Sequence, residues 1–205
     1  MKRKLLTLVF ALLITGCANP INQRTANNYF IEGESAMQQG NLPHAREMFS
    51  RALINARIGN LGAEAEGQVL AKLGRVYGNM CQPDEAEKAF SESITQYSKA
   101  YGENSTRLFT LKLELAQHAY DVGRYEKAVT YFDKAFPWGA EMFDQTDPAG
   151  YAAVMKDYAD ALSKTGKSEQ AKAALAKAST SENKVGSAKV SKNAAEYVRY
   201  PTQCK

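Results

Sequence analysis

Apolar and small residues recur every three to four positions along most of the chain, between short breaks that contain Gly or Pro. This spacing places them on one face of a helix, and no stretch alternates with period two for long enough to indicate a strand. The breaks within successive pairs of helical segments are Gly40-Asn41, Pro83-Asp84-Glu85, Gly123 and Gly166. The pattern therefore predicts an all-α fold built from pairs of antiparallel helices.

The helix pairs repeat with a nearly constant period. In each pair an Ala lies four residues before an aromatic residue or Leu, and a small residue follows three positions later. The anchoring alanines are Ala45, Ala86, Ala128 and Ala171, spaced 41, 42 and 43 residues apart. Such spacing indicates a repeat array. We expect the large residues to fill the space between one pair and the next; they are Phe49, Phe90, Phe132 and Leu175.

Polar residues between the repeats indicate where the first helix of each later pair begins. Asn and Asp side chains cap helix N-termini, and Pro is well tolerated in the first turn. We therefore expect Asn60, Asn104 and the Asp147-Pro148 pair to mark these helix starts.

Two of the four repeats carry the residue pattern of a known family. The matching residues are Leu73, Gly74, Tyr77, Ala86 and Phe90 in the second repeat, and Gly123, Tyr125, Ala128, Phe132 and Ala135 in the third. Over residues 26 to 180 the chain resembles the tetratricopeptide repeat, and its long period is similar to that of kinesin light chains. The resemblance implies a right-handed solenoid of about four helix-turn-helix repeats.

In the family that the chain resembles, the first helices of successive repeats line a concave groove that holds a peptide or a partner helix. The positions carried over are Asn27, Phe30, Glu34 and Met37, then Gln68, Ala71, Arg75 and Asn79, then Thr110, Leu113, Gln117, Tyr120 and Asp121, and finally Lys156, Asp160 and Lys164. Amide side chains suit hydrogen bonding to a peptide backbone, but they are equally ordinary on a solvated helix face. The paired Lys and Asn that clamp a terminal carboxylate in some relatives are missing.

The first 17 residues resemble a bacterial lipoprotein signal. Lys2-Arg3-Lys4 form a basic head, Leu5 to Ile14 an apolar stretch, and Thr15-Gly16 precede Cys17. The apolar stretch is too short for a transmembrane helix, which needs roughly 20 residues. We expect cleavage after Gly16 and a covalent lipid on Cys17, with no other cofactor. An ordinary secretory signal, or a buried helix with an incidental Cys, is the alternative. Ala18 takes the place of the Asp that retains such lipoproteins in the inner membrane, which favours the periplasmic side of the outer membrane.

Four segments are predicted: a removed signal peptide over 1–16, an acylated tether over 17–25, the repeat domain over 26–180 and a basic tail over 181–205. Loss of the signal lowers the 26 basic residues to 23, against 22 acidic ones, so a nucleic-acid partner is not expected. The tail could meet an anionic surface or be merely solvated. It could also form a further helix around residues 194–199 or stay loose.

Two further cysteines, Cys81 and Cys204, would lie in a compartment that permits disulfides. Their spacing fits neither a CxxC redox pair nor a zinc site. A bridge between them would attach the tail to the second repeat, and the sequence leaves this bridge and two free thiols equally open.

No catalytic residue and no metal-ligand set is predicted. His44 and His118 are the only histidines, and neither belongs to a recognisable nucleophile or metal motif. We therefore expect a non-catalytic adaptor that binds another envelope protein or peptide and reaches the membrane through its lipid; its oligomeric state is left open. The alternatives are a structural or regulatory partner of the cell-wall machinery, with the basic tail as important as the groove, and, more remotely, a cell-wall hydrolase.

Overall fold

The computed structural model describes residues 19–187, 199–201 and 204. Within them the chain forms eight α-helices and no strand, which confirms the all-α prediction. The helices are α1 (Pro20–Gln38), α2 (Leu42–Ile58), α3 (Ala63–Asn79), α4 (Pro83–Tyr101), α5 (Thr106–Asp121), α6 (Tyr125–Thr146), α7 (Pro148–Lys164) and α8 (Ser168–Ser187). None of these helices is long and apolar enough to cross a membrane. The expected signal peptide, Cys17 and most of the expected helix at 194–199 lie outside the described residues.

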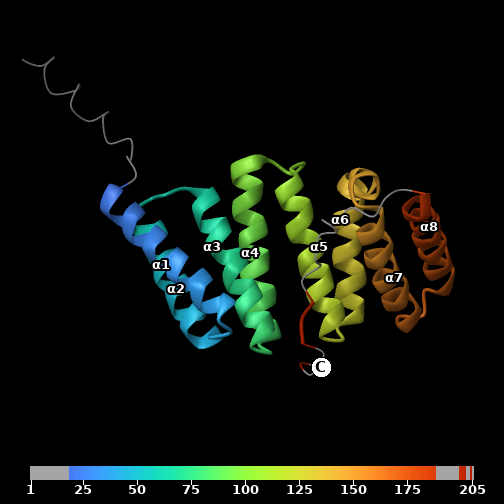
Figure 1. The fold of residues 1–205 in the computed structure, drawn as a ribbon, viewed down its shortest axis with the longest axis horizontal. Coiled ribbons are helices and arrows are strands. Elements are labelled where there is room, and N and C mark those ends of the chain that lie inside the picture. Colours follow the sequence, from blue (N-terminus) through green and yellow to red (C-terminus); the bar gives the residue numbers. More distant parts are fainter. Residues whose placement is uncertain (1–18, 188–198, 202–203, 205) are drawn as a thin grey trace, which may run out of the picture.

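Four helix pairs, α1 with α2 through α7 with α8, follow one another along the long axis of the molecule (Figure 1). Within each pair the chain turns through a residue with positive φ. Three pairs use Gly40, Gly123 and Gly166, with φ of 73°, 78° and 77°. The second pair uses Cys81, with φ of 57°. A left-handed conformation is unfavourable for a residue with a side chain, so this one turn is made at some energetic cost.

The core lies between successive pairs and is built on the predicted aromatic positions. Phe49, Phe90 and Phe132 are fully buried, which confirms that expectation. Leu175 does not follow them: its side chain is 48% exposed. The position packs against the next helix pair, and within the described residues no pair follows α8.

The helix starts agree only in part with those predicted. Asp147 caps α7, where its carboxylate accepts a hydrogen bond from the Gly150 amide at 3.0 Å. The expectation for Asn104 is wrong by one residue, since Ser105 caps α5. Asn60 caps no helix; it adopts φ of 50° in the turn before α3. The first helix begins at Pro20, inside the segment expected to be a tether, because the Asn19 side chain caps it.

Polar contacts between neighbouring pairs define two faces of the array. On one, first helices contact first helices: Glu34 with Lys72, Arg75 with Glu114, and Tyr120 with Asp160. On the other, second helices contact second helices: Arg57 with Glu92, Lys127 with Glu87, and Lys184 with Asp144. We call these the first-helix face and the second-helix face. Each pair contributes one helix to each face, so the first-helix face runs the whole length of the array.

Candidate functional site

Part of the first-helix face is open. A hollow of about 490 Å³ lies between α1 and α3, and the predicted residues Asn27, Phe30 and Gln68 line it together with Leu61 and Val69. We call this hollow the open groove. A second hollow of about 320 Å³ continues it between α3 and α5. The two hollows share Gln68, so they adjoin on this face.

Farther along the same face, the C-terminal residues 199–201 occupy the surface. Figure 1 shows this segment beside α5, although α8 lies at the far end of the array. Tyr200 is only 2% exposed, and its hydroxyl donates a hydrogen bond to Glu114 Oε1 at 3.0 Å. Its ring meets the His118 ring edge to face, with centroids 4.7 Å apart. Tyr200 therefore packs as part of the buried core.

Gly78 provides the floor on which the Tyr200 ring rests. A Cβ atom at this position would overlap the Tyr200 ring and would lie 3.0 Å from His118 Cδ2. Gly is unfavourable inside a helix, and Gly78 lies in the last turn of α3. The close approach of the Tyr200 ring explains why the helix carries a Gly here.

The main chain of the segment is also bound. The Tyr200 amide donates to Asp121 Oδ2 at 2.9 Å, while the amide group of Gln117 donates to Asp121 Oδ1 at 3.2 Å. The Arg199 guanidinium pairs with Asp157 at 2.5 Å and lies 3.6 Å from Asp121. Asp121 thus receives two hydrogen bonds and lies beside a cation. We call Gly78, Glu114, His118, Asp121 and Asp157 the tail site.

Glu114 is oriented by a bidentate ion pair across the α3–α5 junction. Arg75 donates to Glu114 from Nε at 2.6 Å and from a terminal nitrogen at 2.8 Å. The hydrogen bond with Glu114 is the main cause that raises the pKa of Arg75. Such a planar, two-point pair fixes the carboxylate in one orientation. Glu114 is thereby held in place to accept from Tyr200.

Burial shifts the titration of three groups in the tail site. It raises the pKa of Asp121, and it raises that of Tyr200 well above 10.0 with help from the Glu114 charge. It lowers the pKa of His118 to about 4, and the Arg124 charge adds to the effect. At neutral pH the phenol is therefore protonated and the imidazole uncharged. Two buried polar atoms, Gln117 Oε1 and His118 Nε2, have no hydrogen-bond partner in the described part of the chain.

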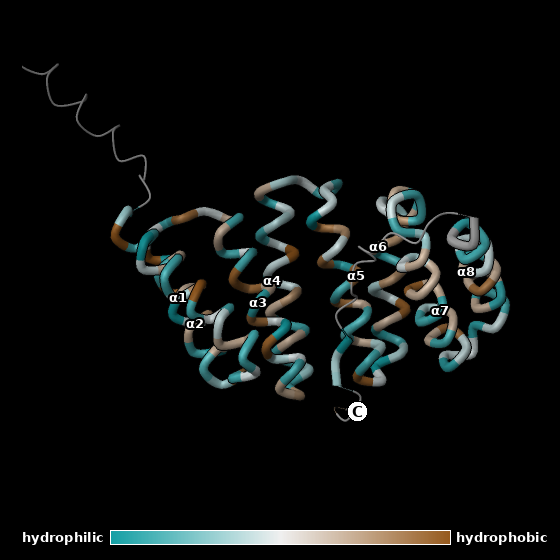
Figure 2. The backbone as a smooth tube through the Cα atoms, viewed as in Figure 1, coloured by the Kyte–Doolittle hydropathy of each residue, from teal (hydrophilic) through white to brown (hydrophobic). Residues whose placement is uncertain are grey.

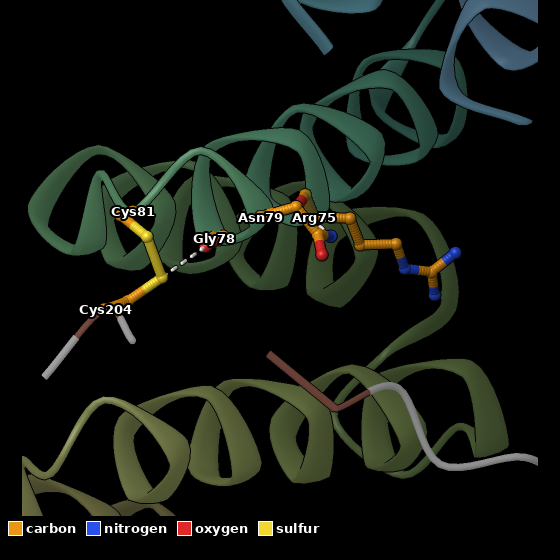
Figure 3. The surroundings of a disulfide bond; sticks show 5 residues. All are labelled: Arg75, Gly78, Asn79, Cys81 and Cys204. Carbon is orange, nitrogen blue, oxygen red and sulfur yellow. Dashed lines mark hydrogen bonds between the residues drawn. A yellow bond between two sulfur atoms is a disulfide. The ribbon is translucent and has the colours of Figure 1, made fainter. Parts of the chain in front are cut away.

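A disulfide joins Cys81 to Cys204 and fastens the tail beside this site (Figure 3). Their Cα atoms are 4.9 Å apart, and 123 positions separate them in the sequence. Cys204 Sγ lies 3.9 Å from the carbonyl oxygen of Gly78. The bridge therefore reaches the end of α3 directly beside the residue on which Tyr200 rests.

Comparison with known proteins agrees with this geometry. The tetratricopeptide repeat family model matches residues 66–137. Residues 66–137 therefore carry tetratricopeptide repeats (TPRs), and the chain has the TPR solenoid fold. No curated protein sequence matches it.

Solved structures share the TPR fold over most of the chain. BtubC (BKLC) from P. vanneervenii has a TM-score of 0.73 and 16% identity, covering 83% of this chain and 68% of its own. A putative kinesin light chain with TPR-like repeats from Podosopora anserina has a TM-score of 0.62 and 15% identity, covering 80% and 77%. A Rap protein complexed with Competence and Sporulation Factor has a TM-score of 0.57 and 17% identity, covering 81% and 45%. The expected resemblance to TPR proteins with long repeats is confirmed.

The predicted TPR groove residues fall into distinct environments. Asn27, Phe30 and Gln68 line the open groove, and Arg75 lines its continuation together with Ala71 and Thr110. Glu34 pairs with Lys72, and Met37 packs against the core. Asn79 donates to the Arg75 carbonyl oxygen (Figure 3). Gln117 and Asp121 are buried at the tail site, while Tyr120 and Lys164 both contact Asp160.

At two positions the TPR register predicted from sequence is off by one residue. Leu113 is buried in the core, and the neighbouring Glu114 binds the tail. Lys156 pairs with Glu182 of α8 at 2.5 Å, and the neighbouring Asp157 binds Arg199. One residue turns a helix by about 100°, so a shift of one position moves a side chain to a different face.

Sequence reasoning also missed Gly78, His118 and Tyr200 as members of one site. Gly78 follows Gly74 by one helical turn, and only Gly74 is explained by the TPR pattern, through its contact with Phe90. That second Gly was the one local signal available. Groups of three or more His, Cys, Asp or Glu residues that could hold a metal ion do not occur among the described residues.

Proposed function

We propose that this TPR protein is a lipid-anchored adaptor on the periplasmic side of the outer membrane, where its first-helix face binds a segment of another envelope protein. The observation that carries the proposal is that this face holds a peptide segment, residues 199–201, through both main-chain and side-chain contacts. TPR proteins bind protein or peptide partners. The Rap protein of similar fold was crystallised with Competence and Sporulation Factor.

The open groove is the part of the face that a partner can reach directly. Asn27 and Gln68 are exposed there and offer amide donors and acceptors, while Phe30 offers an apolar surface. This combination suits an extended chain, because amide groups pair with its backbone and the ring takes one of its side chains. A partner segment bound in the groove would run toward the tail site along the same face.

Two features at the N-terminal end support a membrane anchor there. Only Ala18 and Asn19 separate Cys17 from the start of α1. Ile21 is 74% exposed and Ile58 is 70% exposed. The Asn19 amide donates to the Gly59 carbonyl oxygen at 3.0 Å, which keeps both isoleucines at one end of the array.

A lipid on Cys17 would bring this apolar end to the membrane surface. Figure 2 shows hydrophobic positions at the start of α1 and in the connection from α2 to α3. Single acyl chains hold proteins only marginally, and nearby apolar contacts strengthen the attachment. The open groove, between α1 and α3, would then lie close to the membrane, and the later repeats would extend away from it.

Site-specific photocrosslinking in cells tests the adaptor role. A photoreactive amino acid at Gln68, on the first-helix face, should crosslink to one defined protein. The same amino acid at Lys88, exposed on α4 of the second-helix face, is the matched control. The proposal fails if Gln68 yields no adduct, or if both positions give the same adducts.

Metabolic labelling tests the anchor. Cells grown with labelled palmitate should incorporate it into the wild-type chain, and Cys17→Ala should abolish the label and release the protein from the membrane fraction. Absence of label in the wild-type chain would contradict the anchor while leaving the crosslinking result to be judged separately.

A further inference from the structure

The tail site contacts its occupant at three chemically different points. Glu114 accepts a hydrogen bond from the phenolic hydroxyl of Tyr200, and Gly78 and His118 contact the ring. Asp121 accepts from the main chain at 2.9 Å, which fixes the direction of the segment. Asp157 accepts from the Arg199 guanidinium. A cationic side chain followed by a tyrosine is therefore distinguished from other dipeptides by its charge, by its hydroxyl and by its direction.

The charge of the tail site agrees with a cationic ligand. Glu114 is neutralised by its bidentate pair with Arg75. Among the residues that the structure describes, only Arg199 lies within ion-pair distance of Asp121 and Asp157. A segment that lacks a positive charge would leave these two carboxylates uncompensated, with Asp121 buried. This cost selects Arg or Lys immediately before the tyrosine.

The tail is an imperfect occupant of this site. Gln117 Oε1 and His118 Nε2 are buried beside it without a hydrogen-bond partner among the described residues. The disulfide that holds the tail starts from Cys81, whose φ of 57° is a conformation that Gly adopts in the other three turns. The unpaired polar atoms weaken the binding of the tail. The disulfide offsets this loss, because it keeps the tail at a high effective concentration beside the site.

We propose that the tail site is a recognition site for an Arg-Tyr segment of a protein partner, and that residues 199–201 are its intramolecular occupant, which such a segment displaces. This inference rests on the proposed function, since it assigns a ligand class to the same first-helix face. The partner segment would enter from the open groove and end with its Arg-Tyr pair in the tail site. While Cys81 and Cys204 are joined, the tail would outcompete it.

Peptide binding to an opened form of the chain tests the proposal. The probe is a fluorescent, end-blocked hexapeptide with the sequence of residues 198–203, Val-Arg-Tyr-Pro-Thr-Gln. The chain with Cys17→Ala, Tyr200→Ala and Cys204→Ser should bind it saturably in fluorescence anisotropy, whereas the oxidised Cys17→Ala chain should not. Replacing Tyr by Phe in the peptide removes a hydrogen bond to a charged group and should weaken binding roughly 10- to 100-fold. Equal binding of a scrambled hexapeptide would overturn the proposal.

Gly78→Ala in the opened chain is the matched control. The added methyl group fills the tyrosine slot but favours the helix, so circular dichroism should be unchanged and peptide binding lost. Retained binding would show that the peptide sits elsewhere, and the proposal would fail. Should the opened chain not fold, the reduced Cys17→Ala chain gives a second readout: the Arg-Tyr peptide should accelerate alkylation of Cys204, and an unchanged rate would count against the proposal.

The outcomes separate this inference from the adaptor function. A crosslinked partner at Gln68 combined with no Arg-Tyr preference would leave the adaptor role intact and remove only the ligand assignment. Specific peptide binding without any crosslinked partner would retain the site chemistry and remove the adaptor role.

Discussion

The open groove and the tail site belong to one face and one type of repeat, yet they use polar residues in opposite ways. In the open groove Asn27 and Gln68 are exposed, so any hydrogen bond they make competes with water. In the tail site Glu114 and Asp121 are buried beneath Tyr200, where each contact acts in a low dielectric and an unpaired group is costly. The comparison shows that the repeat supplies a polar surface and that a covering segment buries part of it and pairs its polar groups.

The largest expected effect comes from the aromatic core beneath each region. Phe49 lies under the open groove and Phe90 under the tail site, where its ring centroid is 6.4 Å from that of Tyr200. Either Phe→Ala change should lower the free energy of unfolding by about 3–5 kcal/mol through lost burial and an unfilled cavity. Urea denaturation of the oxidised chain measures this loss.

Only Phe90→Ala should also loosen the tail. Trypsin cleavage after Arg199, followed by mass spectrometry, reports release of Tyr200 from its slot. We expect faster cleavage in Phe90→Ala and the wild-type rate in Phe49→Ala. Equal rates in the two variants would mean that the tail site does not depend on the core beneath it, and the distinction between the two regions would be lost.

The next largest difference in stability between the two regions should come from removing one carboxylate charge in each. Glu114→Gln breaks a buried bidentate pair and leaves Arg75 without its partner, which should cost about 3 kcal/mol. Glu34→Gln breaks a more exposed pair with Lys72, between the two helices that flank the open groove, and should cost under about 1 kcal/mol. Thermal and urea unfolding of both variants check this difference. Comparable small losses would show that water reaches Glu114 despite the tail.

Acidification should weaken the tail site through His118. The unfolded chain binds this proton with a pKa near 6.5, whereas the folded chain binds it only near 4. The uncharged His118 therefore stabilises the folded state fully above pH 6.5, and this stabilisation is lost as the pH falls toward 4. Between pH 7 and pH 5 the free energy of unfolding should fall by about 2 kcal/mol through this group. Asp121 acts in the opposite sense, because its pKa is raised by burial and the folded state holds that proton more tightly.

Urea unfolding at pH 7 and pH 5 measures the loss, and His118→Phe is the control. The variant keeps a ring against Tyr200 and keeps Asp121, so its stability should change less between the two pH values than that of the wild-type chain. An equal change in both would assign the acid sensitivity to other groups.

The array was predictable from sequence because its signals are local. The period of the anchoring alanines and the aromatic positions Phe49, Phe90 and Phe132 follow from helix geometry within a single repeat. Leu175 departed from the pattern because burial at that position depends on a further helix pair. Local periodicity describes a repeat, but it does not show whether a further helix pair packs against that repeat.

The tail site was not predictable in the same way, because it joins segments that are distant in sequence. Tyr200 meets Glu114 and Asp121 across 86 and 79 positions, and no periodicity records such a contact. The carried-over register placed Leu113 on the face, one residue from the correct Glu114. The sequence signals that bear on the tail were the cysteine pair and the second Gly of α3. The pair indicates that the tail reaches α3 and the Gly indicates space for a ring there, so neither alone predicts the site.

The smallest expected effect concerns which region lies nearer the membrane. If Cys17 is acylated, Ile21 and Ile58 should contact lipid and the tail site should not. Ile21→Ser with Ile58→Ser should leave the unfolding free energy within about 0.5 kcal/mol, because both side chains are exposed. Transfer of the lipidated variant between vesicles should be roughly 30-fold faster than that of the wild-type chain, since partial immersion of each of the two isoleucines contributes roughly 1 kcal/mol. Ile54→Ser, one helical turn from Ile58 on α2, is the control and should have a smaller effect. Equal acceleration by Ile54→Ser would mean that the flank of the first helix pair, and not its end, contacts the membrane. The open groove would then not be the region nearest the membrane.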